Sequence, residues 1–258
     1  MSLFNLEGRV ALVTGGGRGI GRGIAEGLAD HGAKVVVAAR TEAQTEETAE
    51  AIRSKGGEAI PVTLDMTSMD SIQGSVDKSI ETFGQLDILV NNAGMNIREP
   101  LEEVTEDHYD QIASVNQKGL FFMTQVAAKH MRPRGRGKII NIGSLTTGVG
   151  LASVSVYTGT KGAVGQLTKV HAVELAPEIQ VNAICPGFIL TPLTEKLWSN
   201  PSMRDWGEKR CAHGRLGVPE DLLGTAVFLA SKASDYVTGQ LIYVDGGFMA
   251  GERWLDNA

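Results

Sequence analysis

Cysteine is scarce in this chain of 258 residues, with Cys185 and Cys211 as its only two. Two thiols without C-x-x-C spacing make neither a disulfide framework nor a zinc site. The five histidines are scattered, and none belongs to a metal-ligand pair such as H-E-x-x-H. We therefore expect no metal in the functional site.

Long apolar runs and linkers are missing as well. No run approaches the ~18 apolar residues that a membrane-spanning helix needs. The N-terminal MSLFNLEGR lacks the basic stretch and apolar core of a secretory signal. No Pro/Ser-rich or low-complexity stretch divides the chain. We expect one domain over residues 1–258, no membrane partner and a cytoplasmic location.

Positive charge is in deficit. The net charge of −6 and a pI of about 5.4 argue against nucleic acid as a partner. The one basic stretch, residues 132–138, is interpreted as a solvated loop that follows a helix.

What the chain does have is a glycine-rich turn between an apolar run at 10–13 and an amphipathic run at 20–28. This order predicts a strand, a turn and a helix, and the free N–H groups at a helix N-terminus bind phosphate. The spacing is Thr14-Gly15-x-x-x-Gly19-x-Gly21. Neither G-x-G-x-x-G nor a Walker P-loop fits it. A purely structural glycine turn is the alternative.

Strand-like and helix-like stretches alternate along the rest of the chain. Strands are expected at 33–39, 59–64, 86–90, 138–142, 180–184 and 240–244, and helices at 41–54, 68–83, 105–131, 154–175 and 219–230. A capping box at Thr41-x-x-Gln44 is expected to start the first of these helices. The predicted fold class is α/β, a single-domain Rossmann-type doubly wound parallel sheet of about seven strands with helices on both faces. Such sheets bind ligands at the carboxyl ends of their strands.

The tetrapeptide Asn91-Asn92-Ala93-Gly94 directly follows the fourth strand. Through this motif, the glycine spacing and a set of four polar residues in matching order, the chain resembles the classical short-chain dehydrogenase/reductase family. The four residues are Asn116, Ser144, Tyr157 and Lys161. The resemblance implies an oxidoreductase that transfers a hydride between a nicotinamide cofactor and a ketone or secondary alcohol.

Tyr157 and Lys161 lie four residues apart on an expected helix, so both project from one face. Reduction of a ketone requires a proton on its oxygen, and a phenol with a pKa near 10 does this efficiently only if that pKa falls. We expect Lys161 and the oxidised nicotinamide to lower the pKa of Tyr157, and Ser144 to donate a hydrogen bond to the substrate oxygen. The resemblance implies that Lys161 also holds the nicotinamide ribose and that Asn116 holds a water that links Lys161 to solvent.

Arg40 directly follows the second strand, where an acid would bind the ribose of NAD. With Arg18 in the glycine turn it suits the 2′-phosphate of NADP, so NADP(H) is the preferred cofactor and NAD(H) the second choice. The alternative is that both arginines are solvated surface residues.

Asp65 follows the third strand. The resemblance places it beside the adenine, and the alternative is a helix N-cap. The expected cofactor-binding residues are Gly15, Arg18, Gly19, Ile20, Gly21, Arg40, Asp65, Asn92, Ala93, Gly94, Tyr157, Lys161, Pro186, Gly187 and Thr191.

The segment from about 190 to 214 is expected to be a lid over the substrate; a surface helical pair with two packing tryptophans is the alternative, and the two are compatible. Residues 92–100, 214–221 and 227–239 are closest in appearance to the gluconate 5-dehydrogenase and 2-deoxygluconate dehydrogenase members of the family. This implies a keto-sugar acid such as 5-ketogluconate as substrate. The candidate substrate residues are Arg98, Thr146, Trp198, Trp206 and Arg210.

Three other functions compete with this interpretation. They are a 3-oxoacyl-[acyl-carrier-protein] reductase, a broad-specificity carbonyl reductase and a non-catalytic NADPH-binding regulator.

The resemblance also implies a homo-oligomer, a tetramer in which the helices near 105–131 and 154–175 pair across one interface. The tail at 248–258, with Arg253 and Trp254, is then expected to reach a neighbouring subunit.

Overall fold

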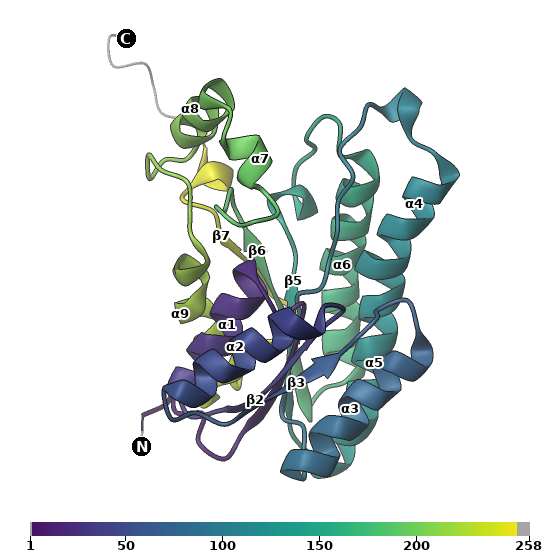
Figure 1. The fold of residues 1–258 in the computed structure, drawn as a ribbon, viewed down its shortest axis with the longest axis vertical. Coiled ribbons are helices and arrows are strands. Elements are labelled where there is room, and N and C mark those ends of the chain that lie inside the picture. The colour runs from purple at the N-terminus through teal and green to yellow at the C-terminus, as the bar shows by residue number, and fades with distance from the viewer. Residues whose placement is uncertain (1, 252–258) are drawn as a thin grey trace.

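All seven strands of the computed structural model run parallel in one sheet of order β3-β2-β1-β4-β5-β6-β7 (Figure 1). The structure describes residues 2–251. The strands are β1 (Val10–Thr14), β2 (Lys34–Ala39), β3 (Ala59–Thr63), β4 (Ile88–Asn91), β5 (Gly137–Ile142), β6 (Ile179–Pro186) and β7 (Leu241–Val244). In the middle of the sheet, Leu12 of β1 lies opposite Val36 of β2 and Leu89 of β4.

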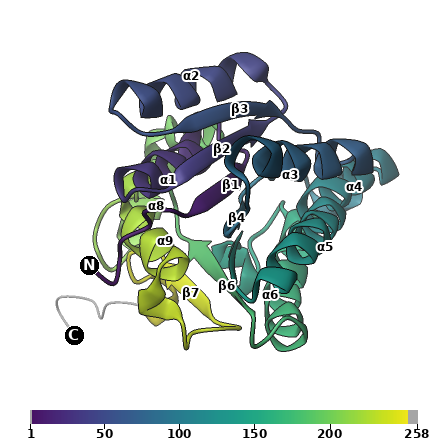
Figure 2. The same ribbon diagram turned by 90° about the horizontal axis from the view of Figure 1, so that it is seen from below.

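Helices cover both faces of the sheet (Figure 2). One face packs against α1 (Gly19–Asp30), α2 (Glu42–Ser54) and α9 (Leu223–Ala230). The other face packs against α3 (Met69–Phe83), α5 (Leu120–Met131) and α6 (Ser155–Glu174), and α4 (Glu106–Ala113) contacts α6. Two short helices, α7 (Glu195–Trp198) and α8 (Pro201–Arg210), lie between β6 and β7 in the sequence. No helix within residues 2–251 is long and apolar enough to cross a membrane.

The predicted fold class is confirmed, and the reason is visible in the strands themselves. Val35, Val36, Val37 and Ala38 of β2 are fully buried, as a strand covered on both faces requires. The chain leaves β1 toward β2 and β3 and then returns to the other side of β1 with β4. This switch opens a crevice at the carboxyl ends of β1 and β4, where doubly wound sheets bind their ligands.

Helices α2 and α3 begin where the sequence predicted, but two capping features considered there do not form. Thr41 is the N-cap residue of α2, but its side chain makes no capping hydrogen bond, so the capping box with Gln44 does not form. The N-cap residue of α3 is Ser68, whose side chain accepts from the Ser71 N–H, and not Asp65. The Asp65 carboxylate instead accepts two hydrogen bonds from Thr67, which lower its pKa most, and the charge of Arg40 lowers it further.

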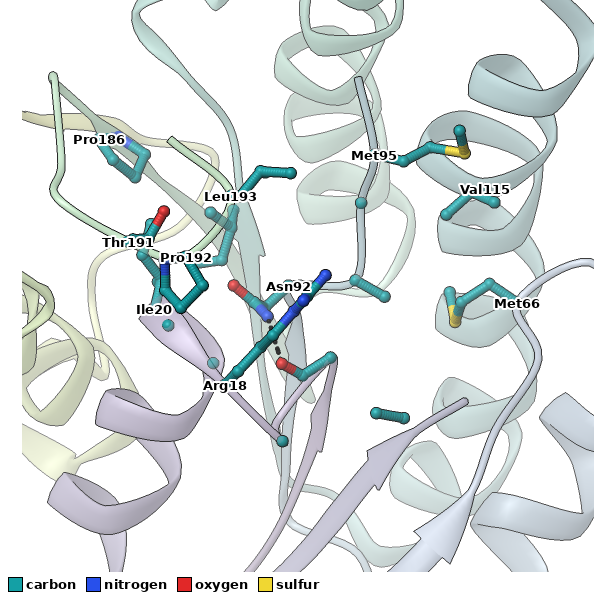
Figure 3. A pocket seen from close by; sticks show the side chains of 18 of the residues that line it. Arg18, Ile20, Met66, Asn92, Met95, Val115, Pro186, Thr191, Pro192 and Leu193 are labelled. Carbon is teal, nitrogen blue, oxygen red and sulfur yellow. Dashed lines mark hydrogen bonds between the residues drawn. The ribbon is translucent and has the colours of Figure 1, made fainter. Parts of the chain in front are cut away.

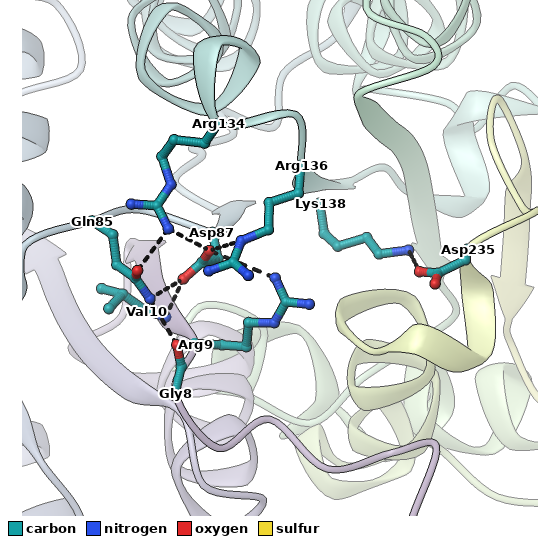
Figure 4. A network of polar contacts seen from close by, with 9 residues as sticks. All are labelled: Gly8, Arg9, Val10, Gln85, Asp87, Arg134, Arg136, Lys138 and Asp235. Carbon is teal, nitrogen blue, oxygen red and sulfur yellow. Dashed lines mark hydrogen bonds and ion pairs between the residues drawn. The ribbon is translucent and has the colours of Figure 1, made fainter.

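The basic stretch 132–138 is more than the solvated loop that was expected. At the edge of the sheet where the strands begin, Arg9, Arg134 and Arg136 surround the carboxylate of Asp87, with N–O distances of 3.6, 3.5 and 3.0 Å (Figure 4). The carboxylate is 1% exposed and also accepts from the Val10 N–H. Asp87 therefore joins the beginnings of β1, β4 and β5.

Candidate active site

A cavity opens at the carboxyl ends of the strands, between the glycine turn and α6 (Figure 3). Its wall comes from the turn after β1, the ends of β2 to β6, helix α6 and the first residues of the expected lid. Every residue expected to bind the cofactor lines it. Of the expected catalytic residues Ser144, Tyr157 and Lys161 line it, and Asn116 does not.

The glycine turn and the motif after β4 are held together by hydrogen bonds. The Thr14 hydroxyl accepts from the N–H groups of Asn92 and Ala93, both at 3.0 Å, and the Asn92 amide donates to the carbonyl oxygens of Thr14 and Gly15. A Cβ at Gly21 would lie 2.2 Å from the Gly15 oxygen, so glycine is required there. The close approach of α1 to this turn aims the helix N-terminus into the cavity.

The described residues fit a dinucleotide phosphate. The N-cap residue of α1 is Arg18, which makes no side-chain capping bond, and the first turn of α1 contains no acid. The first N–H groups of this helix and its positive end are therefore available to an anion. Arg18 extends into the cavity in Figure 3, and Arg40 lines the same cavity at the end of β2. A dinucleotide bound there would meet N–H groups and two guanidinium groups.

Three of the four catalytic candidates lie together in the part of the cavity wall formed by the end of β5 and by α6. Ser144 follows β5, and Tyr157 and Lys161 lie one turn apart on α6. The Lys161 side chain is almost fully buried, and its Nζ donates to the carbonyl oxygen of Ile142 at 2.7 Å. The same nitrogen lies 5.6 Å from the centre of the Tyr157 ring.

The protein groups alone do not give the lowered phenol pKa that was expected from Lys161 and the oxidised nicotinamide together. Burial raises the pKa of Tyr157, and the Ser144 hydroxyl beside the phenol opposes this only in part. Burial also lowers the pKa of Lys161 to about 8. The reason is that desolvation disfavours both charged forms, while the Lys161 ammonium is bonded to a carbonyl rather than to the phenol. Burial thus favours the protonated phenol, the form that a proton donor requires.

Asn116 lies on a π-helical turn, Ser114–Gly119, that joins α4 to α5 within the helical stretch expected at 105–131. Its amide is buried, accepts from the Met95 N–H, and donates to the Met95 carbonyl oxygen and to Thr160 Oγ1. With both amide hydrogens committed to protein atoms, the side chain positions the segment after Gly94. The expected role of holding a water remains a prediction.

None of the five candidate substrate residues lines the cavity. Trp198 is 4% exposed, and Trp198 and Trp206 both pack against Phe188, with ring centroids 5.1 and 5.5 Å away. The tryptophans thus form the packed helical pair that was the alternative. Arg210 stacks on Phe248, and Arg98 is exposed. Thr146 is buried and hydrogen-bonds Ser144.

Part of the expected lid does border the cavity, through Pro192, Leu193 and Thr194. The tail begins with Phe248, whose ring packs 5.2 Å from that of Phe188. Arg253 and Trp254 lie outside the described residues.

Apolar residues that sequence analysis missed complete the wall of the cavity, among them Met66, Met95 and Val115 in Figure 3. Each is a single apolar residue in a loop or helix, and no local pattern distinguishes it from a core residue.

Comparison with known proteins agrees with this geometry. A family model described as Enoyl-(Acyl carrier protein) reductase matches residues 15–249. Gluconate 5-dehydrogenase of Gluconobacter oxydans (strain 621H) is 42% identical over 246 residues, which cover 95% of this chain and 96% of that protein. The 2-dehydro-3-deoxy-D-gluconate 5-dehydrogenase of Bacillus subtilis (strain 168) is 44% identical over 248 residues, or 96% of this chain and 97% of the other.

A solved structure extends the likeness to three dimensions. A gluconate 5-dehydrogenase from Burkholderia cenocepacia J2315, crystallised in complex with NADP and tartrate, matches with a TM-score of 0.93 at 40% identity. The match covers 96% of this chain and 98% of that one. Because a family model matches most of the chain and these relatives are 40–44% identical over nearly its whole length, the chain belongs to the short-chain dehydrogenase/reductase family.

Proposed function

We propose that this chain is an NADP(H)-preferring oxidoreductase that interconverts a keto-sugar acid, such as 5-ketogluconate, and the corresponding secondary alcohol. One observation carries the proposal: Ser144, Tyr157 and Lys161 share a cavity with the glycine turn at the carboxyl edge of the sheet. Two relatives at 42 and 44% identity are named for gluconate-type substrates, which supports the substrate class.

NADP is supported by the charges at the adenosine end of the cavity. Arg18 and Arg40 line it, and the carboxylate there, that of Asp65, already accepts from Thr67. Guanidinium groups match the geometry of a phosphate, so the two arginines would hold the 2′-phosphate. The Burkholderia cenocepacia relative was crystallised with NADP.

NADPH, when bound, supplies the hydride to the substrate carbon. The protein supplies the rest. The protonated phenol of Tyr157 gives its proton to the ketone oxygen, and the Ser144 hydroxyl donates a hydrogen bond to that oxygen as charge develops on it. The buried Lys161 ammonium stabilises the phenolate that remains. Residues 190–214 act as the lid, because Pro192, Leu193 and Thr194 already border the cavity and lids exclude water from such sites.

The direct experiment is a panel of initial rates. NADPH and NADH are each offered with 5-ketogluconate, a deoxy-ketogluconate, an acetoacetyl thioester and a neutral diketone. Fastest turnover of a keto-sugar acid with NADPH supports the whole proposal, and a preference for NADH contradicts the role of the arginines. A best rate on the thioester or the diketone favours an acyl-carrier-protein reductase or a general carbonyl reductase, and no turnover at all favours a cofactor-binding regulator.

Arg98 is proposed as the cation that receives the substrate carboxylate. It is exposed, follows the Asn91–Gly94 motif by four residues, and makes no hydrogen bond or ion pair within residues 2–251. Replacing Arg98 with Ala is expected to raise KM about tenfold for the keto-sugar acid and to leave KM for the neutral diketone unchanged, because a charge-assisted hydrogen bond is lost. Initial rates measure both.

The matched control for this change is Arg53→Ala. Arg53 lies on α2 and pairs with Glu50 at 2.7 Å, so its loss removes one positive charge at a distance from the motif. Equal changes in KM for acidic and neutral substrates in Arg98→Ala would refute the role of Arg98 as a carboxylate ligand.

We further propose a homotetramer located in the cytoplasm. Apolar side chains are exposed on α5 and α6, with Phe121, Val170 and Val173 at 39, 44 and 79% exposure, and a second copy would cover them. The two cysteines are free, as is usual in a reducing compartment. Light scattering is expected to give a mass near four times the 27.4 kDa of one chain, and a monomeric mass would contradict the proposal.

A further inference from the structure

The hydroxyl of Ser144 is held by the turn that follows it. Ser144 is the N-cap residue of the 3-10 turn Leu145–Thr147, directly after β5. Its Oγ accepts two hydrogen bonds from the same residue, one from the Thr146 N–H and one from the Thr146 hydroxyl, both at 3.1 Å. Its own N–H donates to Thr147 Oγ1, also at 3.1 Å. Backbone and side chain of Ser144 are therefore both fixed by this turn.

Counting donors and acceptors determines what the Ser144 hydroxyl can still do. A serine hydroxyl has one hydrogen to donate and two lone pairs to accept with. Both lone pairs are occupied by the two donors of Thr146. The one remaining capacity is donation, and Ser144 lines the cavity together with Tyr157. The hydrogen is thus directed away from the turn.

The donor direction matters for the reaction proposed above. The oxygen of a ketone gains negative charge during reduction, so it is stabilised by a donor and repelled by a lone pair. A serine hydroxyl that is free to rotate would present either one. Hydroxyl donors fixed before the substrate arrives need no reorganisation during the reaction.

We propose that Thr146 is a positioning residue, which forces the Ser144 hydroxyl to act as a donor to the substrate oxygen. This assignment rests on the proposed reduction of a ketone. It also replaces the expectation that Thr146 contacts the substrate, because its side chain is 5% exposed and its hydroxyl is committed to Ser144.

The test compares Thr146→Val, which removes the hydroxyl at nearly the same volume, with Thr146→Ser, which retains it. Thr146→Val is expected to lower kcat about five- to tenfold with little change in KM, and Thr146→Ser to stay within about twofold of the wild-type chain. NADPH binding and the melting temperature are measured for each. If the valine variant loses either, Thr146→Ala takes its place, since a smaller side chain cannot clash.

A double-mutant cycle separates positioning from a general structural effect. In the Ser144→Ala background the serine hydroxyl is gone, so Thr146→Val is expected to have no further effect. A full additional loss in that background overturns the proposal, as does wild-type or faster turnover in Thr146→Val alone. A wild-type chain that reduces no ketone in the panel overturns the proposed function and this assignment together.

Discussion

Replacement of Tyr157 by phenylalanine is expected to lower kcat/KM about 1,000-fold, within the range that positioned acid-base groups contribute. The change removes a single oxygen, which is the atom that carries the transferable proton. Lys161 and Ser144 stay in place, and neither can substitute. The Lys161 ammonium donates to the Ile142 carbonyl, and the Ser144 hydroxyl is an aliphatic alcohol, a much weaker acid than a phenol. Initial rates with NADPH and the best ketone of the panel measure the loss.

The matched control is Tyr236→Phe, because the Tyr236 side chain is fully exposed. It is expected to keep wild-type rates, and both variants are expected to bind NADPH with wild-type affinity. If Tyr157→Phe retains more than a tenth of the activity, another group delivers the proton and the proposed mechanism is wrong.

The second large effect concerns stability, at the opposite edge of the sheet. Asp87→Ala is expected to lower the free energy of unfolding by about 3–5 kcal/mol, because a buried carboxylate that holds three partly exposed guanidinium groups and a buried backbone N–H is lost. Without the carboxylate, the guanidinium groups of Arg9, Arg134 and Arg136 repel one another, and the buried Val10 N–H loses its acceptor (Figure 4). Thermal unfolding is expected to shift by about 6–15 °C.

Asp205→Ala provides the comparison for this change. Asp205 pairs with Lys209 at 2.7 Å, but both side chains are exposed, and exposed pairs contribute about 1 kcal/mol or less. Asp87→Asn is expected to lie between the two, because an amide oxygen still accepts from Val10 while the negative charge is lost. A melting temperature for Asp87→Ala that matches that of Asp205→Ala would show that the cluster contributes little.

Much of the fold follows from local sequence patterns. The apolar run of β2, the glycine turn and the alternation of strands with helices all arise between residues that are near in sequence, so they can be recognised without tertiary information. The grouping of Ser144, Tyr157 and Lys161 can be predicted from the sequence in the same way. Tyr157 and Lys161 share one helix face, and Ser144 follows the end of a strand. The cavity lining agrees with these predictions.

Contacts between distant parts of the chain needed the structure. No local pattern indicates that Arg134 and Arg136 reach Asp87, or that Trp198 packs on Phe188 instead of meeting substrate. These pairings depend on how strands and helices pack, which decides which side chains are buried together.

The hydrogen bonds of the site and the directions of its pKa shifts were likewise decided by tertiary structure. The sequence by itself determined that a phenol and an ammonium share one helix face, and so which chemical groups the reaction uses. Only packing determined that both are buried, that Lys161 is bonded to Ile142 and that Thr146 occupies the lone pairs of Ser144. The physical reason is that pKa values and hydrogen-bond directions depend on desolvation and on the nearest polar atoms, and folding brings those atoms from separate elements.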